Sequence, residues 1–276
     1  MAFAMLNPII RLLPEVKLPE RPPTMRERIM WVVAGLLIYF IMFNTPAIGS
    51  NVTQLEGLEF LAVITASRFG TLLTIGIGPI VMASIFLQLF NGAGILKFDM
   101  RNPEDRKQFF GLQKLLAIIL AFFEAFMFVA FGKVPVIEGM AVPVMFQIAM
   151  GSIILLYLDE IITKYGFGSG ISLFIAAGVS FSVIIGVVGL ITGPGGVIEI
   201  LSAGGSEALT KALLKLTPLY FTILVFVIVV YAEGMKIEIP LAFDMARGAA
   251  GRLPIKFLYV SNIPVILTAA LMMNIT

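Results

Sequence analysis

The residue best placed to do chemistry is Glu124, because it lies near the middle of a long apolar run. An ionised carboxylate inside a membrane costs several kcal/mol unless it is paired, protonated or facing water, so such a residue is a functional candidate by default. The structural alternative is a protonated Glu124 that hydrogen-bonds a neighbouring helix. Asn274, in the last apolar run, is a candidate partner for that bond.

Few other side chains could act as catalysts. The chain of 276 residues contains no His and no Cys, which removes imidazole bases, thiolate nucleophiles and the commonest ligands of zinc, copper and haem iron. A phosphate-binding loop, G-x-x-x-x-G-K followed by Ser or Thr, does not occur. Asp99, Asp159 and Asp244 fall in loops or at the ends of apolar runs, so the sequence lacks the paired aspartates of intramembrane proteolysis. We therefore expect no enzyme, no metal site and no cofactor.

A second unusual feature is the series Gly76, Ile77, Gly78 and Pro79 within an apolar run. Pro79 cannot donate a backbone hydrogen bond, so a carbonyl one turn earlier loses its partner. In lipid, protein or a water-filled cavity must replace that partner. The simpler interpretation is an ordinary proline kink.

Two pairs of branched aliphatic residues share helix faces, Ile77 with Val81 and Ile171 with Ile175. Such pairs usually reflect packing alone. Their functional interpretation is a constriction that seals by excluding water and yields without breaking a specific hydrogen bond.

The elements that must position these residues are transmembrane helices. Hydrophobic residues make up 59% of the chain and charged residues 13%, against about 25% charged residues in an ordinary soluble domain. A water-soluble fold is therefore excluded. Crossing the hydrocarbon core takes about 20 apolar residues, and seven runs qualify: 29–48, 69–90, 115–131, 140–158, 171–191, 216–232 and 257–276. A half-apolar stretch at 58–66 precedes the second run and predicts a half-helix.

The basic residues predict how these runs are oriented. Of the 19 Lys and Arg residues, 15 lie before the first run or after the second, fourth and sixth, and four lie on the opposite side. By the positive-inside rule, the N-terminus and those three loops are cytoplasmic. Two of the loops, 91–112 and 233–256, are long and basic, which is typical of attraction to anionic lipids or of a docking site.

Three long stretches of the sequence resemble SecY, the protein-conducting channel, in its archaeal form. They read TASRFGTLLTIGIGPIV at 65–81, YLDEIITKYGFGSGISLFIAAGVS at 157–180 and PIKFLYVSNIPVIL at 254–267. Shorter matches, QKLL at 113–116 and IPLAF at 239–243, extend the resemblance over essentially all of residues 14–276.

The resemblance implies ten helices in two pseudo-symmetric halves with a short plug helix, of which this chain supplies the first seven. The expected fold is therefore an all-α polytopic membrane protein, with seven transmembrane helices plus the plug half-helix. Residues 1–28 form a cytoplasmic N-terminal segment, and 29–192 form the N-terminal half with the plug at about 57–68. Residues 193–276 begin the C-terminal half and include the basic loop 233–256.

The resemblance also implies roles for individual residues. The pore ring consists of Ile77, Val81, Ile171, Ile175 and Ile266. The plug includes Leu58, Leu61, Ile64, Thr65, Ser67 and Arg68. Glu124 and Asn274 are polar residues of the lateral gate, and Arg247, Arg252 and Lys256 contact the ribosome.

Two positions depart from the family pattern. Met82 occupies a gate position that often carries a hydroxyl, which predicts a gate held by fewer hydrogen bonds. Met245 stands in the basic loop where relatives often carry another basic residue, which leaves the strength of ribosome binding open.

The expected function is that of the central pore subunit of the Sec translocase in the cell membrane. It conducts unfolded polypeptides outward and releases hydrophobic segments laterally into the bilayer lipids. The implied partners are SecE, a small β-type (SecG-like) subunit, the ribosome, signal sequences and nascent polypeptides.

The alternative function is a secondary transporter, which also uses broken helices and a mid-membrane carboxylate such as Glu124. A transporter site needs convergent polar side chains, whereas Ile77, Ile80, Val81 and Met82 surround the break. A passive scaffold, the third class, leaves the long basic loops and the half-helix unexplained.

Overall fold

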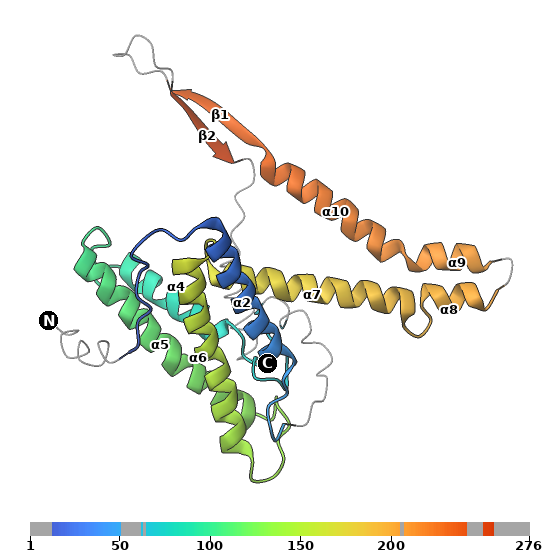
Figure 1. The fold of residues 1–276 in the computed structure, drawn as a ribbon, viewed down its shortest axis with the longest axis horizontal. Coiled ribbons are helices and arrows are strands. Elements are labelled where there is room, and N and C mark those ends of the chain that lie inside the picture. The colour runs from blue at the N-terminus through green and yellow to red at the C-terminus, as the bar shows by residue number, and fades with distance from the viewer. Residues whose placement is uncertain (1–12, 51–61, 63–64, 205–206, 242–250, 257–276) are drawn as a thin grey trace. The chain divides into compact units, whose positions relative to one another are not determined.

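The computed structural model describes residues 13–50, 62, 65–204, 207–241 and 251–256 (Figure 1). The described residues divide into two compact units, one up to Phe181 and one from Ser182. We describe each unit by itself.

The first unit is a bundle of apolar helices: α2 (Met25–Asn44), α4 (Gly78–Gly92), α5 (Pro103–Ala130), α6 (Ala141–Tyr165) and the part of α7 (Gly170–Thr192) up to Phe181. Within it α5 packs against both α4 and α6, and α2 packs against α6. Local signals set two of the helix starts. Thr24 and Glu27 form a capping box at α2, and Asn102 caps α5 by accepting from the Glu104 N–H at 3.1 Å.

The largest apolar cluster described in this unit receives residues from all of its helices. Its fully buried members include Tyr39 of α2, Ile77 at the start of α4, Leu155 of α6 and Phe174 of α7. The rings of Tyr39 and Phe174 stack with their centroids 5.2 Å apart. This cluster therefore lies where α2, α4, α6 and α7 converge, and a second buried cluster lies between α5 and α6.

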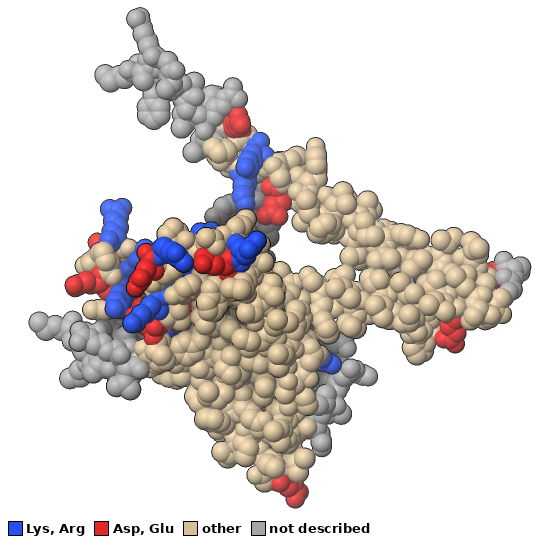
Figure 2. All heavy atoms as spheres, viewed as in Figure 1, with Lys and Arg blue, Asp and Glu red and all other residues tan. Residues whose placement is uncertain are grey.

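Charged side chains of the first unit gather at one end, over the start of α5 and the chain before α2 (Figure 2). The bodies of α5 and α6 below that end are almost free of charge in the same view. A charged end followed by a long uncharged surface is expected of helices that cross a bilayer.

The second unit contains the rest of α7, α8 (Val197–Ser202), α9 (Ala208–Lys215) and α10 (Thr217–Gly234). An antiparallel ribbon follows, formed by β1 (Lys236–Leu241) and β2 (Gly251–Lys256). No residue of α10 is buried among the described residues. The segment Ala208–Gly234, which joins α9 and α10, reaches a mean hydropathy of 2.3 over 18 residues, none of which is buried. Such a segment is suited to lipid or to further protein around it.

Five helical segments of the described residues are long and apolar enough to cross a membrane. They correspond to the predicted runs 29–48, 115–131, 140–158, 171–191 and 216–232, and the mostly helical, multi-pass class is confirmed. The seventh run, 257–276, lies outside the described residues. The β1–β2 ribbon within the basic loop 233–256 was not predicted.

The second predicted run, 69–90, is not helical throughout. The helix α4 begins only at Gly78, and the preceding chain makes turns with positive φ at Gly70 (78°) and Gly76 (52°). The kink interpretation of Pro79 is therefore wrong. Pro79 lies in the first turn of α4, where a missing N–H breaks no helical hydrogen bond.

The predicted basic loop 91–112 is also shorter than expected. The helix α4 continues to Gly92 and α5 already begins at Pro103. The cap at Asn102 and the acidic first turn at Glu104 and Asp105 start the helix among charged residues, well before its apolar run. Hydropathy alone could not locate this start.

Candidate functional site

Four of the five predicted ring residues lie in one apolar cluster. Ile77 and Val81 of the α4 start are buried within it, and Ile171 and Ile175 of α7 are half-buried and pack against it. Ile266 lies outside the described residues. The structure thus brings together two pairs of aliphatic residues, one from each of two helices, that lie about ninety residues apart in the chain.

Hydrogen bonds from the main chain at Gly76 and Ile77 to other parts of the chain hold Ile77 in place. Its N–H donates to the Thr65 carbonyl at 3.1 Å, and the Ser152 hydroxyl of α6 donates to the Gly76 carbonyl at 3.0 Å. A Cβ at Gly76 would collide with the Thr65 carbonyl oxygen, so only glycine fits there. Protein groups therefore satisfy the broken backbone, as a membrane interior demands.

The described part of the predicted plug packs directly before this break. Thr65 and Ser67 are buried, with their hydroxyl oxygens 2.8 Å apart. Arg68 is exposed, donates to the Asn44 side-chain oxygen at 2.7 Å and lies 5.8 Å from the ring centroid of Phe43. Leu58, Leu61 and Ile64 lie outside the described residues.

Glu124 of α5 reaches the start of α4. It is 5% exposed, and its Oε1 has no hydrogen-bond partner among the described residues. Its Oε2 lies 3.2 Å from the point that a Cβ on Gly78 would occupy. Asn274, the partner expected from the sequence, lies outside the described residues. Met82, at the position often taken by a hydroxyl, is buried in α4.

Asp159 of α6 has a corresponding place at the start of α7, which sequence reasoning missed. Its Oδ1 accepts a hydrogen bond from the Ile171 N–H at 2.8 Å and one from the Thr163 hydroxyl at 3.5 Å. A Cβ on Gly170 would lie 2.7 Å from the Asp159 Cα. The short connection between α6 and α7 is the only sequence signal for this contact.

A cluster of charges around Glu160 was also missed. Its Oε2 lies 2.6 Å from the Lys114 Nζ, and its Oε1 lies 2.8 Å from the Lys164 Nζ. The pair of Glu160 and Lys164, four residues apart on α6, is recognisable from the sequence. Lys114 belongs to α5, 46 residues away, and only the packing of α5 on α6 brings it there.

This cluster binds residues 14–18, which we call the N-terminal strap. The Lys114 Nζ donates to the Pro14 carbonyl at 3.0 Å, the Lys164 Nζ donates to the Val16 carbonyl, and the Val16 N–H donates to Glu160 at 3.2 Å. The Tyr165 hydroxyl donates to the Lys17 carbonyl at 2.9 Å. Extended backbone is thereby fixed across the ends of α5 and α6.

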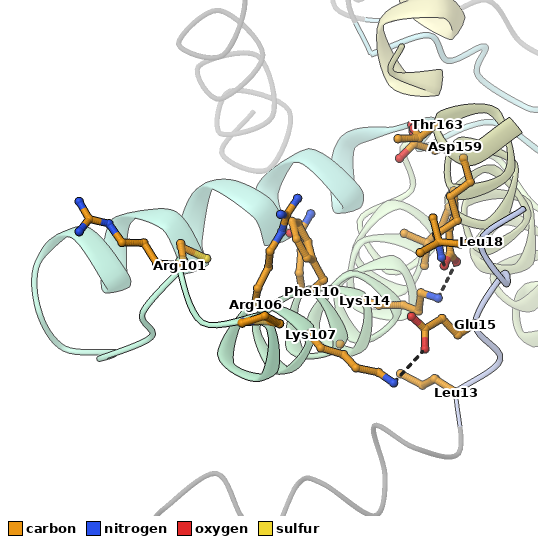
Figure 3. Close-up of a pocket in the computed structure, with 17 residues that line it drawn as sticks. Leu13, Glu15, Leu18, Arg101, Arg106, Lys107, Phe110, Lys114, Asp159 and Thr163 are labelled. Atoms are coloured by element: carbon orange, nitrogen blue, oxygen red, sulfur yellow. Dashed lines mark hydrogen bonds and ion pairs between the residues drawn. The ribbon is translucent and has the colours of Figure 1, made fainter. Parts of the chain in front are cut away.

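A cavity of about 950 Å³ opens beside the strap, between the start of α5 and the end of α6 (Figure 3). In this view Glu15 of the strap reaches Lys107 of α5, and their charged atoms are 3.8 Å apart. Arg106 lies over the ring of Phe110, 5.7 Å from its centroid. Most charged side chains that line this cavity therefore already contact other residues of the chain.

Of the predicted ribosome-contacting residues, only Lys256 is fully described. It is exposed and pairs in register with the exposed Lys236 at the open end of the β1–β2 ribbon. Arg252 lies on β2 opposite Pro240. Arg247 and Met245 lie outside the described residues.

These features define a class: a multi-pass helical membrane protein in which aliphatic side chains from two separate helix starts, α4 and α7, meet in one buried cluster. Solved structures of that class match it closely. A structure described as that of a protein conducting channel has a TM-score of 0.79, 47% identity, and covers 98% of this chain and 62% of its own. A structure of Sec61 in the canine ribosome–channel complex has a TM-score of 0.78 with 47% identity, again covering 98% and 62%.

The chain belongs to the SecY family, whose family model matches residues 71–275. The protein translocase subunit SecY of Methanocaldococcus jannaschii is 48% identical over 273 residues, which cover 98% of this chain and 61% of that protein. The same subunit of Methanococcus vannielii is 43% identical over 271 residues, covering 98% and 61%. The chain therefore spans about three fifths of the length of these relatives.

Proposed function

We propose that this chain supplies the pore of a Sec translocase. It conducts unfolded polypeptides outward across the cell membrane and releases hydrophobic segments sideways into the lipid. The observation that carries the proposal is the convergence of Ile77, Val81, Ile171 and Ile175 in one apolar cluster, at the start of α4.

Aliphatic side chains suit this task because they seal without specificity. They exclude water and ions when they meet, and they separate around an extended polypeptide without losing any hydrogen bond. Release of hydrophobic segments follows from partition, because about 20 apolar residues gain free energy in hydrocarbon and polar segments do not. The chain carries no catalytic step, so the driving force comes from a partner.

The remaining roles follow the same proposal. Residues 57–68 plug the pore in a first half spanning 29–192, and Glu124 with Asn274 lines the lateral gate. Residues 193–276 begin the second half, in which Arg247, Arg252 and Lys256 meet the ribosome on the cytoplasmic side. Residues 1–28 are cytoplasmic, and SecE with a small β-type subunit completes the complex. Support for the ribosome as partner comes from the similar canine channel, which is described in complex with it.

The proposal is tested by photocrosslinking with the full-length gene product in native membranes. A photoreactive residue replaces Ile77 or Ile175, or Phe226 on the exposed α10 as control. A ribosome-stalled secretory chain should crosslink at the two ring positions and not at the control. Docked ribosomes without any crosslink at a ring position would contradict the proposal. That outcome would favour a solute transporter, for which the position of Glu124 beside Gly78 is the supporting observation.

A further inference from the structure

The start of α7, which carries two of the proposed ring residues, lies directly against α6. The connection between the two helices spans only residues 166–169 and turns at Gly168, whose φ is 64°. Gly170, the first residue of α7, lies so close to α6 that a Cβ there would be 2.7 Å from the Asp159 Cα. The first turn of α7 is therefore positioned by α6, and Asp159 is the residue at the contact.

One directional bond fixes that contact. The first amides of a helix have no acceptor within the helix itself. For α7, Oδ1 of Asp159 accepts the N–H of Ile171 at 2.8 Å, although the two residues lie on different helices. The Thr163 hydroxyl, one turn further along α6, adds a longer bond to the same oxygen at 3.5 Å. A side chain of α6 thus caps α7 at a ring residue.

The bond matters because the ring residues of α7 pack through apolar contacts. Ile171 and Ile175, one turn apart, pack against the large buried cluster. Phe174 lies between them in sequence and stacks on Tyr39 with the ring centroids 5.2 Å apart. Apolar packing is not directional, so by itself it does not define a single rotation of a helix. The hydrogen bond to Asp159 fixes both the height and the rotation of α7 at the ring.

Glu160, the next residue of α6, serves a different helix and provides an internal comparison. Its carboxylate lies 2.6 Å from the Lys114 Nζ of α5 and accepts the Val16 N–H of the N-terminal strap. Consecutive residues of a helix are rotated by about 100° around its axis. The two neighbouring carboxylates therefore hold α7 and α5 separately, and Asp159 is the one that is bonded to a ring residue.

We propose that Asp159 is a positioning residue of the pore, which sets how closely Ile171 and Ile175 fit around a polypeptide during translocation. The inference rests on the proposed function and deepens it. Without the acceptor, the start of α7 adopts other rotations, and the two side chains leave gaps through which ions pass. Asp159 thus contributes to the seal of the pore, although it is not itself one of the ring residues.

The test measures ion efflux through an occupied pore. The full-length channel with its partner subunits is reconstituted in proteoliposomes and loaded with a ribosome-stalled secretory chain, so that the proposed plug at 57–68 is displaced and the ring alone seals. Loss of a helix cap shifts a local equilibrium by about fivefold, so Asp159→Ala should raise the efflux of trapped chloride by about that factor. Asp159→Asn keeps an oxygen acceptor at the same place and should stay near the wild-type rate.

Gly170→Ala breaks the same contact from the other helix. Its Cβ would lie 2.8 Å from Oδ1 of Asp159, so the start of α7 must shift while Asp159 itself is intact. This variant should raise the efflux at least as much as Asp159→Ala does. If Asp159→Ala does not assemble, Gly170→Ala still decides, because an unchanged efflux would contradict the proposed role of the contact.

Glu160→Ala separates sealing from stability. It removes a more heavily bonded carboxylate at the same end of α6, so we expect a larger loss of stability but an unchanged efflux. An efflux that rises as much in Glu160→Ala as in Asp159→Ala would overturn the inference. The same holds if Asp159→Asn leaks as much as Asp159→Ala.

The wild-type channel distinguishes this inference from the proposed function. A stalled chain that crosslinks at neither Ile77 nor Ile175 of the wild type would remove the proposed function, and this inference with it. Normal crosslinking, together with equal efflux in Asp159→Ala and the wild type, would overturn the inference alone.

Discussion

Glu124 and Glu160 lie on adjacent, packed helices and occupy opposite kinds of site. Both oxygens of Glu160 are engaged, by Lys114, by Lys164 and by the N–H of Val16. Glu124 is more deeply buried and leaves Oε1 without a partner among the described residues. Buried polar groups are nearly always hydrogen-bonded, so the unsatisfied one is the exception that needs a reason.

The difference teaches how one side-chain type serves two purposes. Where cationic donors converge at the charged end of the bundle, a glutamate fastens segments together. Where its neighbours are apolar and a glycine leaves room, a buried glutamate keeps one oxygen without a partner among the described residues. We therefore expect Glu160 to matter for stability and Glu124 for function.

The largest expected effect on stability is that of Glu160→Ala. The variant leaves Lys114 and Lys164, whose side chains are only 13% and 20% exposed, without their counter-charge. Loss of one partner from such a buried cluster should lower the free energy of unfolding by about 3 kcal/mol. Denaturant unfolding of the purified full-length complex measures it, and a loss below about 0.5 kcal/mol would show that Glu160 is not the fastening residue.

A smaller effect is expected from Asp159→Ala, which tests the contact between α6 and the start of α7. Removal of the acceptor for the Ile171 N–H should cost about 1 kcal/mol, as for the loss of a helix cap. Amide hydrogen exchange should accelerate at Ile171 and its neighbours but not at the start of α4. Equal acceleration at both helix starts would show that Asp159 does not act locally on the start of α7.

The smallest effect is expected from Glu207→Gln, which supplies the baseline for Glu160. Glu207 pairs with Lys211 at 3.2 Å on one helix, but their side chains are 75% and 66% exposed. Solvent screens such pairs, so the free energy of unfolding should fall by only about 0.3 kcal/mol. A loss as large as that of Glu160→Ala would mean that burial does not explain the strength of the cluster.

Much of the bundle could be predicted because lipid imposes a simple rule on sequence. Long apolar runs located α2, α5, α6, α7 and α10, and the resemblance to SecY selected aliphatic residues that do converge in space. The predicted run began at residue 69, before the true start of α4 at Gly78, because hydropathy does not distinguish an apolar helix from apolar turns formed at glycines. The chain from Gly70 to Gly76 is as apolar as a helix but folds as turns.

The charged contacts were beyond sequence reasoning for a different reason. Lys114 meets Glu160 only because α5 packs against α6 at one particular rotation. The β1–β2 ribbon was missed because its strands mix Lys, Glu and Pro with isoleucine, so they lack the apolar run that marks a buried strand. These features depend on how two distant segments pack or pair with each other, and a single sequence does not show that.

The N-terminal strap is held almost entirely by its main chain, and this has a consequence for how the segment can change. Carbonyl groups of Pro14, Val16 and Lys17, with one N–H, make the anchoring bonds. Apart from Glu15, which pairs with Lys107, we expect side chains there to tolerate substitution while the path of the chain is kept. Proline is not expected to be tolerated at position 16, because it would remove the N–H that donates to Glu160.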